Sequence, residues 1–302
     1  MQIANHLQSG TAVKNIQPAH IPFSPYQPDS TSSDDTDPRF SHSRKYRISK
    51  HSGSNPSHIA ETDCLLQRNG YSIHLVSSLK QRIKASTLIK RMYASRGYQT
   101  ESASVFSTSS NQYTFEARQS QQLIGTLTLT IDTGKGLLAD TLYQPELDQF
   151  RRQGRRLCEV SKLAFNPETS SKEIFASLFH MAYIFAHRIH GVNDSFIEIN
   201  PRHATFYKRM LGFRQVGELR TCPRVNAPAV LLHLDLEYMK EQITTQAGQF
   251  DQKTKSIYPH FFSRIKEREI VHLIQTSQIN QPLLSDIQKS EFSYHIKHLQ
   301  PI

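Results

Sequence analysis

Apolar and polar positions alternate, or recur at helical spacing, along most of the chain from residue 71 onward. Residues 71–76 alternate as a half-buried strand does, and residues 79–97 repeat their apolar positions at helical spacing. The same reasoning predicts six further strands, at residues 113–117, 123–131, 157–165, 195–199, 213–219 and 229–236.

A long helix is expected after Ser170. Ser170 and Glu173 have the spacing of a capping box, in which the two side chains satisfy free N–H groups of the first turn. Residues 175–189 then present one apolar face, and Gly191 follows where a C-terminal cap belongs.

A second capped helix is expected after the strand at 195–199. Asn200 is its N-cap, Pro201 occupies the first helical position and Gly212 ends it. The order of strands and helices predicts an α/β fold with a mixed sheet flanked by helices.

The two ends of the chain have a different composition. Residues 1–66 hold six of the 14 prolines, are rich in Ser and show no apolar periodicity, which predicts a disordered N-terminal arm. From Lys240 the chain is helical and basic in pattern, and apolar residues within 259–274 indicate a segment that docks on the core. We therefore expect an arm (1–66), a domain (67–240) and a helical C-terminal extension (241–302).

Charge and cysteine content restrict the binding partners and the cellular compartment that we expect for this protein. The chain has 36 Lys and Arg against 26 Asp and Glu, a net charge of +10, which suits an acidic partner. No nucleic-acid-binding module is recognisable, so we expect no nucleic acid, whereas peripheral membrane contact stays open. No apolar run reaches the roughly 18 residues of a membrane span, and no secretory signal is visible. Three scattered cysteines fit neither a disulfide framework nor a zinc site, which predicts a cytoplasmic protein without a metal.

The segment Asn200-Pro-Arg-His-Ala-Thr-Phe-Tyr-Lys-Arg-Met-Leu-Gly-Phe213 ends a strand and opens a helix. It resembles the late strand–helix segment of the GNAT N-acyltransferase superfamily, which has an Asn, an aromatic pair and a Gly-Phe at these places. The resemblance implies that Tyr207 protonates the thiolate that leaves an acyl thioester. The alternative is that Tyr207 only packs the helix on the sheet. Asn200 and His203 are candidate substrate contacts, and His203 is also a candidate base.

The strand Leu157-Cys-Glu-Val-Ser-Lys-Leu-Ala-Phe165 carries a second constellation. Alternation places Glu159 and Ser161 on one face and Lys162 on the other, and a bulge would bring Glu159 and Lys162 together. A carboxylate on a central strand is costly unless it is paired or used. The segment is similar to the Glu-x-Ser-Arg signature of the N-acyl amino acid synthases, sisters of the acyl-homoserine-lactone synthases, with Lys162 in place of Arg.

The resemblance covers roughly residues 71–238. It implies a GNAT-like fold, with a mostly antiparallel sheet, and transfer of a medium- or long-chain fatty acyl group from acyl carrier protein to the α-amino group of an amino acid. Glu159 would remove the ammonium proton, with Ser161 and Lys162 near the acceptor. Backbone N–H groups near Leu163 would polarise the thioester carbonyl. Residues 175–189 would line the acyl pocket, although core packing explains them equally well.

The donor is expected to be carrier-bound. Acetyl-CoA-using GNAT enzymes hold the pyrophosphate on a Gly-rich turn after this strand, and residues 166–172 contain no glycine. No cofactor is then required. Basic clusters are candidates for carrier contact, although surface charges often only interact with solvent. The residues selected are Arg91, Arg155, Arg156, Lys208 and Arg209.

Two other functions stay open. An acyl-homoserine-lactone synthase with S-adenosylmethionine as acceptor is disfavoured, because Lys90-Arg-Met-Tyr93 only partly matches the first-helix signature and the chain has no Trp. A non-catalytic protein that binds an acyl carrier or a membrane is allowed by the Lys162 replacement. Cys158 has no recognisable base and is expected to be an inert thiol. The histidines at 180, 187 and 190 are expected to be structural.

Overall fold

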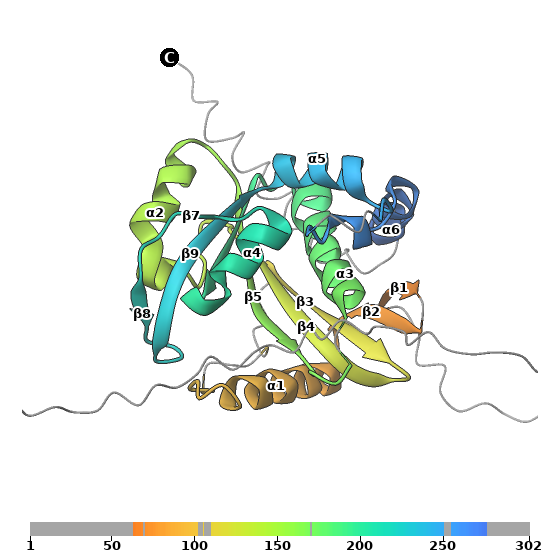
Figure 1. Cartoon of the computed structure of the whole chain (residues 1–302), viewed down its shortest axis with the longest axis horizontal. Helices are drawn as coiled ribbons and strands as arrows, with labels where there is room; N and C mark the ends of the chain where they lie inside the picture. The colour runs from red at the N-terminus through yellow and green to blue at the C-terminus, as the bar shows by residue number, and fades with distance from the viewer. Residues whose placement is uncertain are drawn as a thin grey trace, which may run out of the picture. The chain divides into compact units, whose positions relative to one another are not determined.

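The computed structural model describes residues 63–68, 70–101, 105, 110–169, 171–250 and 255–276. All of them belong to one compact unit, Ser57–Ile302, which is built on a nine-stranded sheet (Figure 1). Residues 1–62, which make up most of the expected arm, and residues 277–302 of the expected extension lie outside the described residues.

The strands follow the order β1-β2-β3-β4-β5-β6-β9-β7, with β8 paired to β9. Only β5 and β6 run parallel, so the expected mixed, mostly antiparallel sheet is confirmed. The strands are β1 (Cys64–Arg68), β2 (Tyr71–Leu75), β3 (Gln112–Gln119), β4 (Gln122–Ile131), β5 (Leu157–Phe165), β6 (Asp194–Ile199), β7 (Arg214–Gln215), β8 (Arg220–Cys222) and β9 (Ala227–Asp235).

Helices cover both faces of the sheet. The apolar contacts of α1 and α2 lie on one face, whereas α3, α4 and the C-terminal helices build the larger core on the other. No helix in the described part of the chain combines the length and the apolar character that crossing a membrane requires. The helices are α1 (Leu79–Ala94), α2 (Asp140–Arg152), α3 (Lys172–Tyr183) with its π-helical continuation η1 (Ile184–Ile189), η2 (Pro201–His203), α4 (Ala204–Leu211), α5 (Leu236–Gln246), η3 (Tyr258–His260) and α6 (Arg264–Thr276).

Several sequence expectations need correction. The N-cap of α3 is Ser171, whose hydroxyl accepts from the backbone N–H of Ile174, so the expected cap at Ser170 is one residue early. The strand expected at 213–219 is only the two residues of β7, because the chain turns at Gly217 to reach β8. The expected domain boundaries fall inside β1 and inside α5, since both elements pair with or pack on the same core.

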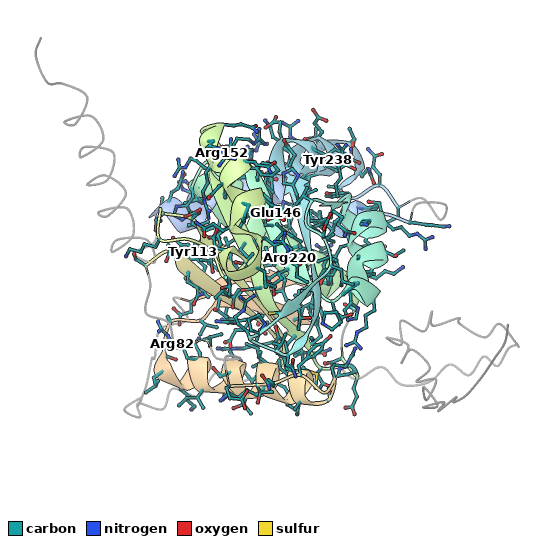
Figure 2. The ribbon with its side chains drawn as sticks, turned by 90° about the vertical axis from the view of Figure 1, so that its left-hand side faces the viewer. Arg82, Tyr113, Glu146, Arg152, Arg220 and Tyr238 are labelled. Carbon is teal, nitrogen blue, oxygen red and sulfur yellow. The ribbon has the colours of Figure 1, made fainter. Side chains whose placement is uncertain are left out.

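Helix α2 lacks a counterpart among the predicted elements. It contains Pro145 and a kink at Tyr143, and only Tyr143 and Leu147 are buried. Arg220 of β8 holds this helix against the sheet, since its guanidinium lies 4.7 Å from the Tyr143 ring centroid. The same guanidinium pairs with Glu146 at 2.5 Å (Figure 2). Helix α2 therefore depends on tertiary contacts more than on its own apolar pattern.

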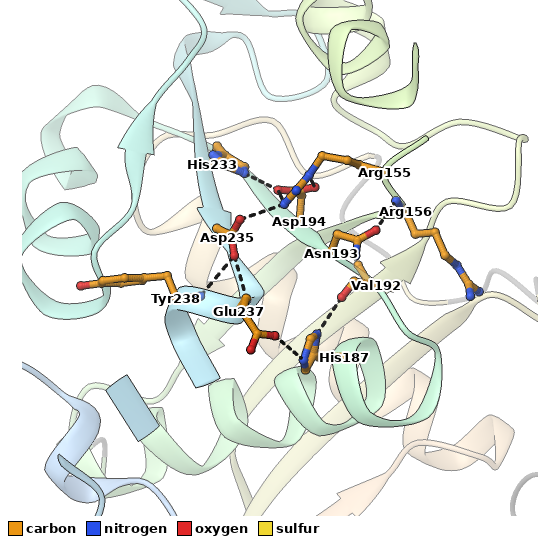
Figure 3. Close-up of polar contacts among 10 residues, drawn as sticks. All are labelled: Arg155, Arg156, His187, Val192, Asn193, Asp194, His233, Asp235, Glu237 and Tyr238. Carbon is orange, nitrogen blue, oxygen red and sulfur yellow. Dashed lines mark hydrogen bonds and ion pairs between the residues drawn. The ribbon is translucent and has the colours of Figure 1, made fainter. Parts of the chain in front are cut away.

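The parallel contact between β5 and β6 is short. It runs only from Leu157 to Glu159 on β5, while β6 stays paired with β9 along its whole length. Just before it, Arg155 pairs with the buried Asp194 and, at 2.8 Å, with Asp235, and His233 donates to Asp194 at 2.7 Å (Figure 3). The two strands are thus clamped at one end and separate beyond Glu159.

The C-terminal segment docks on α3, as expected. Phe261, Phe262, Ile270 and Ile274 are all buried in the large core. His180 of α3 stacks on the ring of Phe262, and its Nδ1 accepts from the Phe262 backbone N–H at 2.8 Å. Because Nδ1 accepts, Nε2 carries the hydrogen and donates to Glu267 of α6 at 3.2 Å.

Candidate active site

Glu159 lies where β5 and β6 begin to separate, and only 2% of it is exposed. The backbone N–H of Ala139, at the start of α2, donates to Oε2 of its carboxyl at 3.1 Å. Burial raises the pKa of Glu159 to about 7, and the charge of Glu198 adds to this, while the Ala139 N–H and Arg224 act against it. A carboxyl with such a pKa is suited to accept a proton near neutral pH.

A β-bulge places Lys162 beside this carboxyl. Thr128 pairs with Ser161 and Thr126 with Ala164, so β5 has one more residue than β4 at this point. Lys162 has a φ of +52°, and the bulge resets the alternation, since Val160 and Leu163 both pack on the large core. Burial lowers the pKa of Lys162, and the nearby charge of Glu159 opposes that shift. The expected bulge is confirmed, and the approach of Lys162 to Glu159 stays a prediction that their electrostatic interaction supports.

Ser161 and Leu163 flank the bulge. The hydroxyl of Ser161 is buried and has no hydrogen-bond partner within the described part of the chain. Buried hydroxyls nearly always have a partner, so this group is free to bind a substrate atom. Leu163 lies on β5 beyond the last residue that pairs with β6, which is where its N–H group was expected.

An ion pair between Arg224 and Glu198, which the sequence analysis did not predict, lies near Glu159. Arg224, in the turn between β8 and β9, lies 2.7 Å from Oε2 of Glu198 on β6 and donates to the carbonyl of Leu138 at 2.7 Å. Both charges act on the pKa of Glu159. Glu198 follows the alternation of its strand, but nothing local to the sequence links it with an arginine of a distant hairpin.

Tyr93, near the C-terminal end of α1, was also missed as a site residue. Burial raises its pKa to about 12, and the charges of Tyr98, Arg224 and Glu159 act on it as well. Tyr93 also raises the pKa of Tyr207, although burial is the larger cause there. Tyr93 thus influences the electrostatics of both Glu159 and Tyr207.

Tyr207 lies on α4 within a group of aromatic rings. Its ring centroid is 6.4 Å from that of Phe175, 6.2 Å from Phe179 and 6.0 Å from Phe213. Burial raises the pKa of Tyr207, so the phenol keeps its proton at neutral pH. The packing role is plain from these contacts, and the proton-donor role stays a prediction.

Asn200 and His203 lie at the two ends of η2, the short helix that leads into α4. The Asn200 side chain caps η2 by accepting from the Arg202 N–H at 3.2 Å, as expected. Burial, together with the charges of Arg202 and Arg96, lowers the pKa of His203 to about 4. The imidazole is therefore neutral at pH 7, so it is no charged partner for a carboxylate, and its low pKa makes it a weak base. Its substrate contact stays a prediction.

The basic residues expected to contact the carrier differ in whether the structure already pairs them with a carboxylate. Arg91, Arg156, Lys208 and Arg209 are exposed, and Lys208 donates to Gln215 at 3.1 Å. Arg155 instead is bound to two carboxylates, so we assign it to the strand clamp and leave it out of the carrier surface.

The remaining candidates are structural. Burial raises the pKa of Cys158 to about 12, which leaves it a thiol at neutral pH, as expected. His190 is buried against the Tyr113 hydroxyl at 2.7 Å, and His187 binds the Val192 carbonyl at 2.9 Å. Within the described ranges, no group of three or more His, Cys, Asp or Glu side chains is arranged to hold a metal ion.

Comparison with known proteins finds a family and a solved structure that resemble this chain. The sequence profile described as "N-acyl amino acid synthase FeeM" matches residues 84–235. The solved structure of FeeM, an N-acyl amino acid synthase from uncultured soil microbes, is 31% identical, with a TM-score of 0.52 over 57% of this chain and 93% of that chain. A search of curated proteins found no match.

Two further solved structures are similar at lower identity. An acyl-CoA N-acyltransferase from Pseudomonas aeruginosa is 14% identical, with a TM-score of 0.38 over 54% of this chain and 97% of that one. The acyl-homoserine-lactone synthase LasI is 10% identical, with a TM-score of 0.39 over 55% of this chain and 89% of that one.

Proposed function

Since this chain belongs to the FeeM family of N-acyl amino acid synthases and is an N-acyltransferase with a GNAT-like fold, we propose that it moves a medium- or long-chain fatty acyl group from an acyl carrier protein thioester to the α-amino group of an amino acid. One observation carries the proposal. Glu159 is a buried carboxyl with a pKa of about 7, at the point where two parallel strands separate.

The proposed reaction begins at the acceptor. The Glu159 carboxylate takes a proton from the ammonium group, and the freed amine attacks the carbonyl carbon of the thioester. The attack forms the C–N bond and an oxyanion, which N–H groups of β5 near Leu163 stabilise. The C–S bond then breaks, and Tyr207, which keeps its proton at neutral pH, gives that proton to the departing thiolate. The second proton that the nitrogen loses as the amide forms restores the Tyr207 phenol.

The acceptor is proposed to be a zwitterion held by the bulge of β5. Its ammonium group faces Glu159 and its carboxylate faces Lys162, whose charge lies within electrostatic range of Glu159. The free hydroxyl of Ser161 supplies a further hydrogen bond. An ammonium group presents one positive charge without the planar fork of Arg, so Lys162 binds a carboxylate less specifically than the family's Arg would.

The donor is proposed to be an acidic carrier protein, which the surface of α1 supports. This helix has no acidic residue, and Lys80, Lys84, Lys90 and Arg91 on it are exposed. Its C-terminal end carries Tyr93, which lies within electrostatic range of Glu159. A carrier on this face would thus dock close to the catalytic carboxyl. We also propose that the reaction takes place in the cytoplasm, as the cysteine pattern predicts.

Mass spectrometry of lipid extracts tests the reaction. Cells that express the intact protein should accumulate N-acyl amino acids, whose masses identify the acceptor and the chain length. Cells that express Glu159→Gln should not, while Glu168→Gln, an exposed carboxyl outside the site, should match the intact protein. An acyl-homoserine lactone as the product would favour the alternative synthase. Folded protein that binds acyl carrier protein without releasing free thiol would favour the non-catalytic alternative.

The donor needs a separate assay with purified components. Free-thiol release should be fast with acyl carrier protein and slow with acyl-CoA. Arg91→Glu should slow the reaction with the carrier protein while leaving the reaction with acyl-pantetheine unchanged, because the small thioester lacks the acidic protein surface that Arg91 is proposed to bind. Lys266→Glu, the same charge change on α6, serves as the matched control. Equal rates for Arg91→Glu and the intact protein would remove α1 from the carrier surface.

A further inference from the structure

A cavity of about 360 Å³ lies among η1, α5 and α6, on the sheet face opposite α1 and α2. These helices lie together beside the end of α3 in Figure 1. Four cationic side chains line the cavity: Arg188 from η1, Lys240 from α5, and Arg264 and Arg268 from α6. Tyr183 and Thr244 add two hydroxyl groups to its wall.

The only carboxylate that lines this cavity is already engaged. Glu267 accepts from His180 at 3.2 Å and lies 3.4 Å from Arg188, so it serves to hold α6 and to orient one of the arginines. Lys240 pairs with the exposed Glu237 at 2.6 Å. Among the described residues, no carboxylate lies within ion-pair distance of Arg264 or Arg268. The cavity thus holds an excess of positive charge with two unpaired guanidinium groups.

We propose that this cavity binds a phosphate-bearing anion. Arg188 and Lys240 each have a carboxylate partner, but Arg264 and Arg268 have none among the described residues. Two neighbouring cations repel each other, and a doubly charged anion between them removes that repulsion. Guanidinium groups bind phosphate oxygens through two parallel N–H bonds, and the hydroxyls of Tyr183 and Thr244 can donate to the same oxygens. A single carboxylate carries half the charge and too few oxygens for this donor set.

The cavity is separate from the acyltransferase site. Glu159 and the bulge face α1 and α2, whereas this cavity is built from helices on the other face of the sheet. Helices α5 and α6 also follow residue 235, where the family match ends. Most of the lining residues therefore lie outside the matched segment, and only Tyr183 and Arg188 lie within it. The site would bind its ligand whether or not the proposed function holds.

Two sources could present the same phosphate chemistry. One is a free phosphorylated metabolite, and the other is the headgroup of an anionic phospholipid. The lipid source has a specific feature in its favour, since α6 exposes Ile265 by 64% and Leu273 by 41%. Exposed apolar residues beside basic ones are typical of helices that lie at a membrane surface.

Isothermal titration of the full chain with inorganic pyrophosphate tests the site. We expect one saturable site per chain, with Kd weakened at least tenfold in Arg268→Ala and in Arg264→Ala, since each variant removes one charge-assisted contact. Lys266→Ala removes a charge from the same helix outside the cavity, and it should bind as the intact protein does. Circular dichroism checks that each variant is folded.

Flotation with vesicles of phosphatidic acid in phosphatidylcholine distinguishes the sources. Binding of pyrophosphate alone identifies a soluble ligand, whereas binding of vesicles that is lost in Arg268→Ala and kept in Lys266→Ala identifies a lipid headgroup. Either result supports the phosphate site. Absence of binding to both probes would overturn the proposal, as would an equal loss in Arg268→Ala and Lys266→Ala, because it would mean charge attraction without a site.

Discussion

Replacing Glu159 by Gln should make the protein both inactive and more stable at neutral and alkaline pH. The substitution keeps the size of the side chain, and the amide oxygen can still accept from the Ala139 N–H. What it removes is the cost of holding a carboxylate among buried groups. The same cost that destabilises the fold gives the carboxyl its affinity for a proton, so the two effects should appear together.

The magnitude follows from the pKa of Glu159. A rise from 4.5 to about 7 corresponds, at 1.36 kcal/mol for each pKa unit, to about 3 kcal/mol. The folded state binds the proton more tightly than the unfolded state, so this contribution lowers the free energy of unfolding as pH rises from about 4.5 to about 7. The intact protein and Glu159→Gln should be nearly equal in stability at pH 4.5, and the variant should be about 3 kcal/mol more stable at pH 8.

Urea unfolding of both proteins at several pH values between 4.5 and 8.5 measures this difference. The remaining titratable groups are shared, so their contributions cancel in the difference between the two proteins. In parallel, kcat/KM of the intact enzyme should rise with pH around 7, and that of Glu159→Gln should be lower by roughly 10² to 10⁴ at pH 8. A stability difference that stays flat with pH, or has the opposite sign, would refute the assigned pKa. Full activity of the variant would remove Glu159 from the mechanism.

Three further substitutions probe other parts of the fold. Asp194→Asn should lower the free energy of unfolding by about 3 kcal/mol in urea titrations at pH 7, since it breaks a buried ionic clamp. Hydrogen bonds from His233 and Arg155 outweigh burial and lower the pKa of Asp194, so its contribution is lost as pH falls through that pKa, and the variant should lack this loss. Gly217→Ala should cost roughly 1 to 3 kcal/mol in calorimetric melting, because the new methyl would lie 2.7 Å from ring atoms of the buried Tyr143; an unchanged Tm would contradict this packing. Tyr207→Phe should lower kcat with little change in Tm, and an unchanged kcat would leave Tyr207 with packing alone.

The elements that sequence patterns located are those whose signals are local. The range of β5 was predicted to the residue, and Asn200 and Gly212 mark a helical segment through a cap and a left-handed residue with φ of +83°. Helix α2 was missed because its kink and Pro145 interrupt the helical repeat, and few of its residues are buried. Strand β8 depends on its hairpin partner β9 and on the contact of Arg220 with Tyr143, neither of which the pattern of its three residues shows.

The active-site residues also differ in whether a local sequence signal or only a tertiary contact brings them together. Glu159 and Lys162 could be paired in advance because both lie on one strand, where a bulge is the simplest way to put them on one face. Glu198 and Arg224 could not, because only the folding of the β8–β9 hairpin brings the arginine to β6. Arg155 was misread for a related reason, since its partners Asp194 and Asp235 come from distant strands.

The docking of α6 on β1 has a consequence for synthesis on the ribosome. Helix α6 contacts β1, and Arg68 lies 5.9 Å from the ring centroid of Phe262, so the first strand of the sheet meets residues that are made much later. Until Ile270 and Ile274 emerge, the apolar face of α3 has no cover on that side. We expect the nascent chain to expose this surface from the synthesis of α3 until α6 is made, which makes it a substrate for chaperones during that interval and makes loss of α6 more harmful than its length suggests.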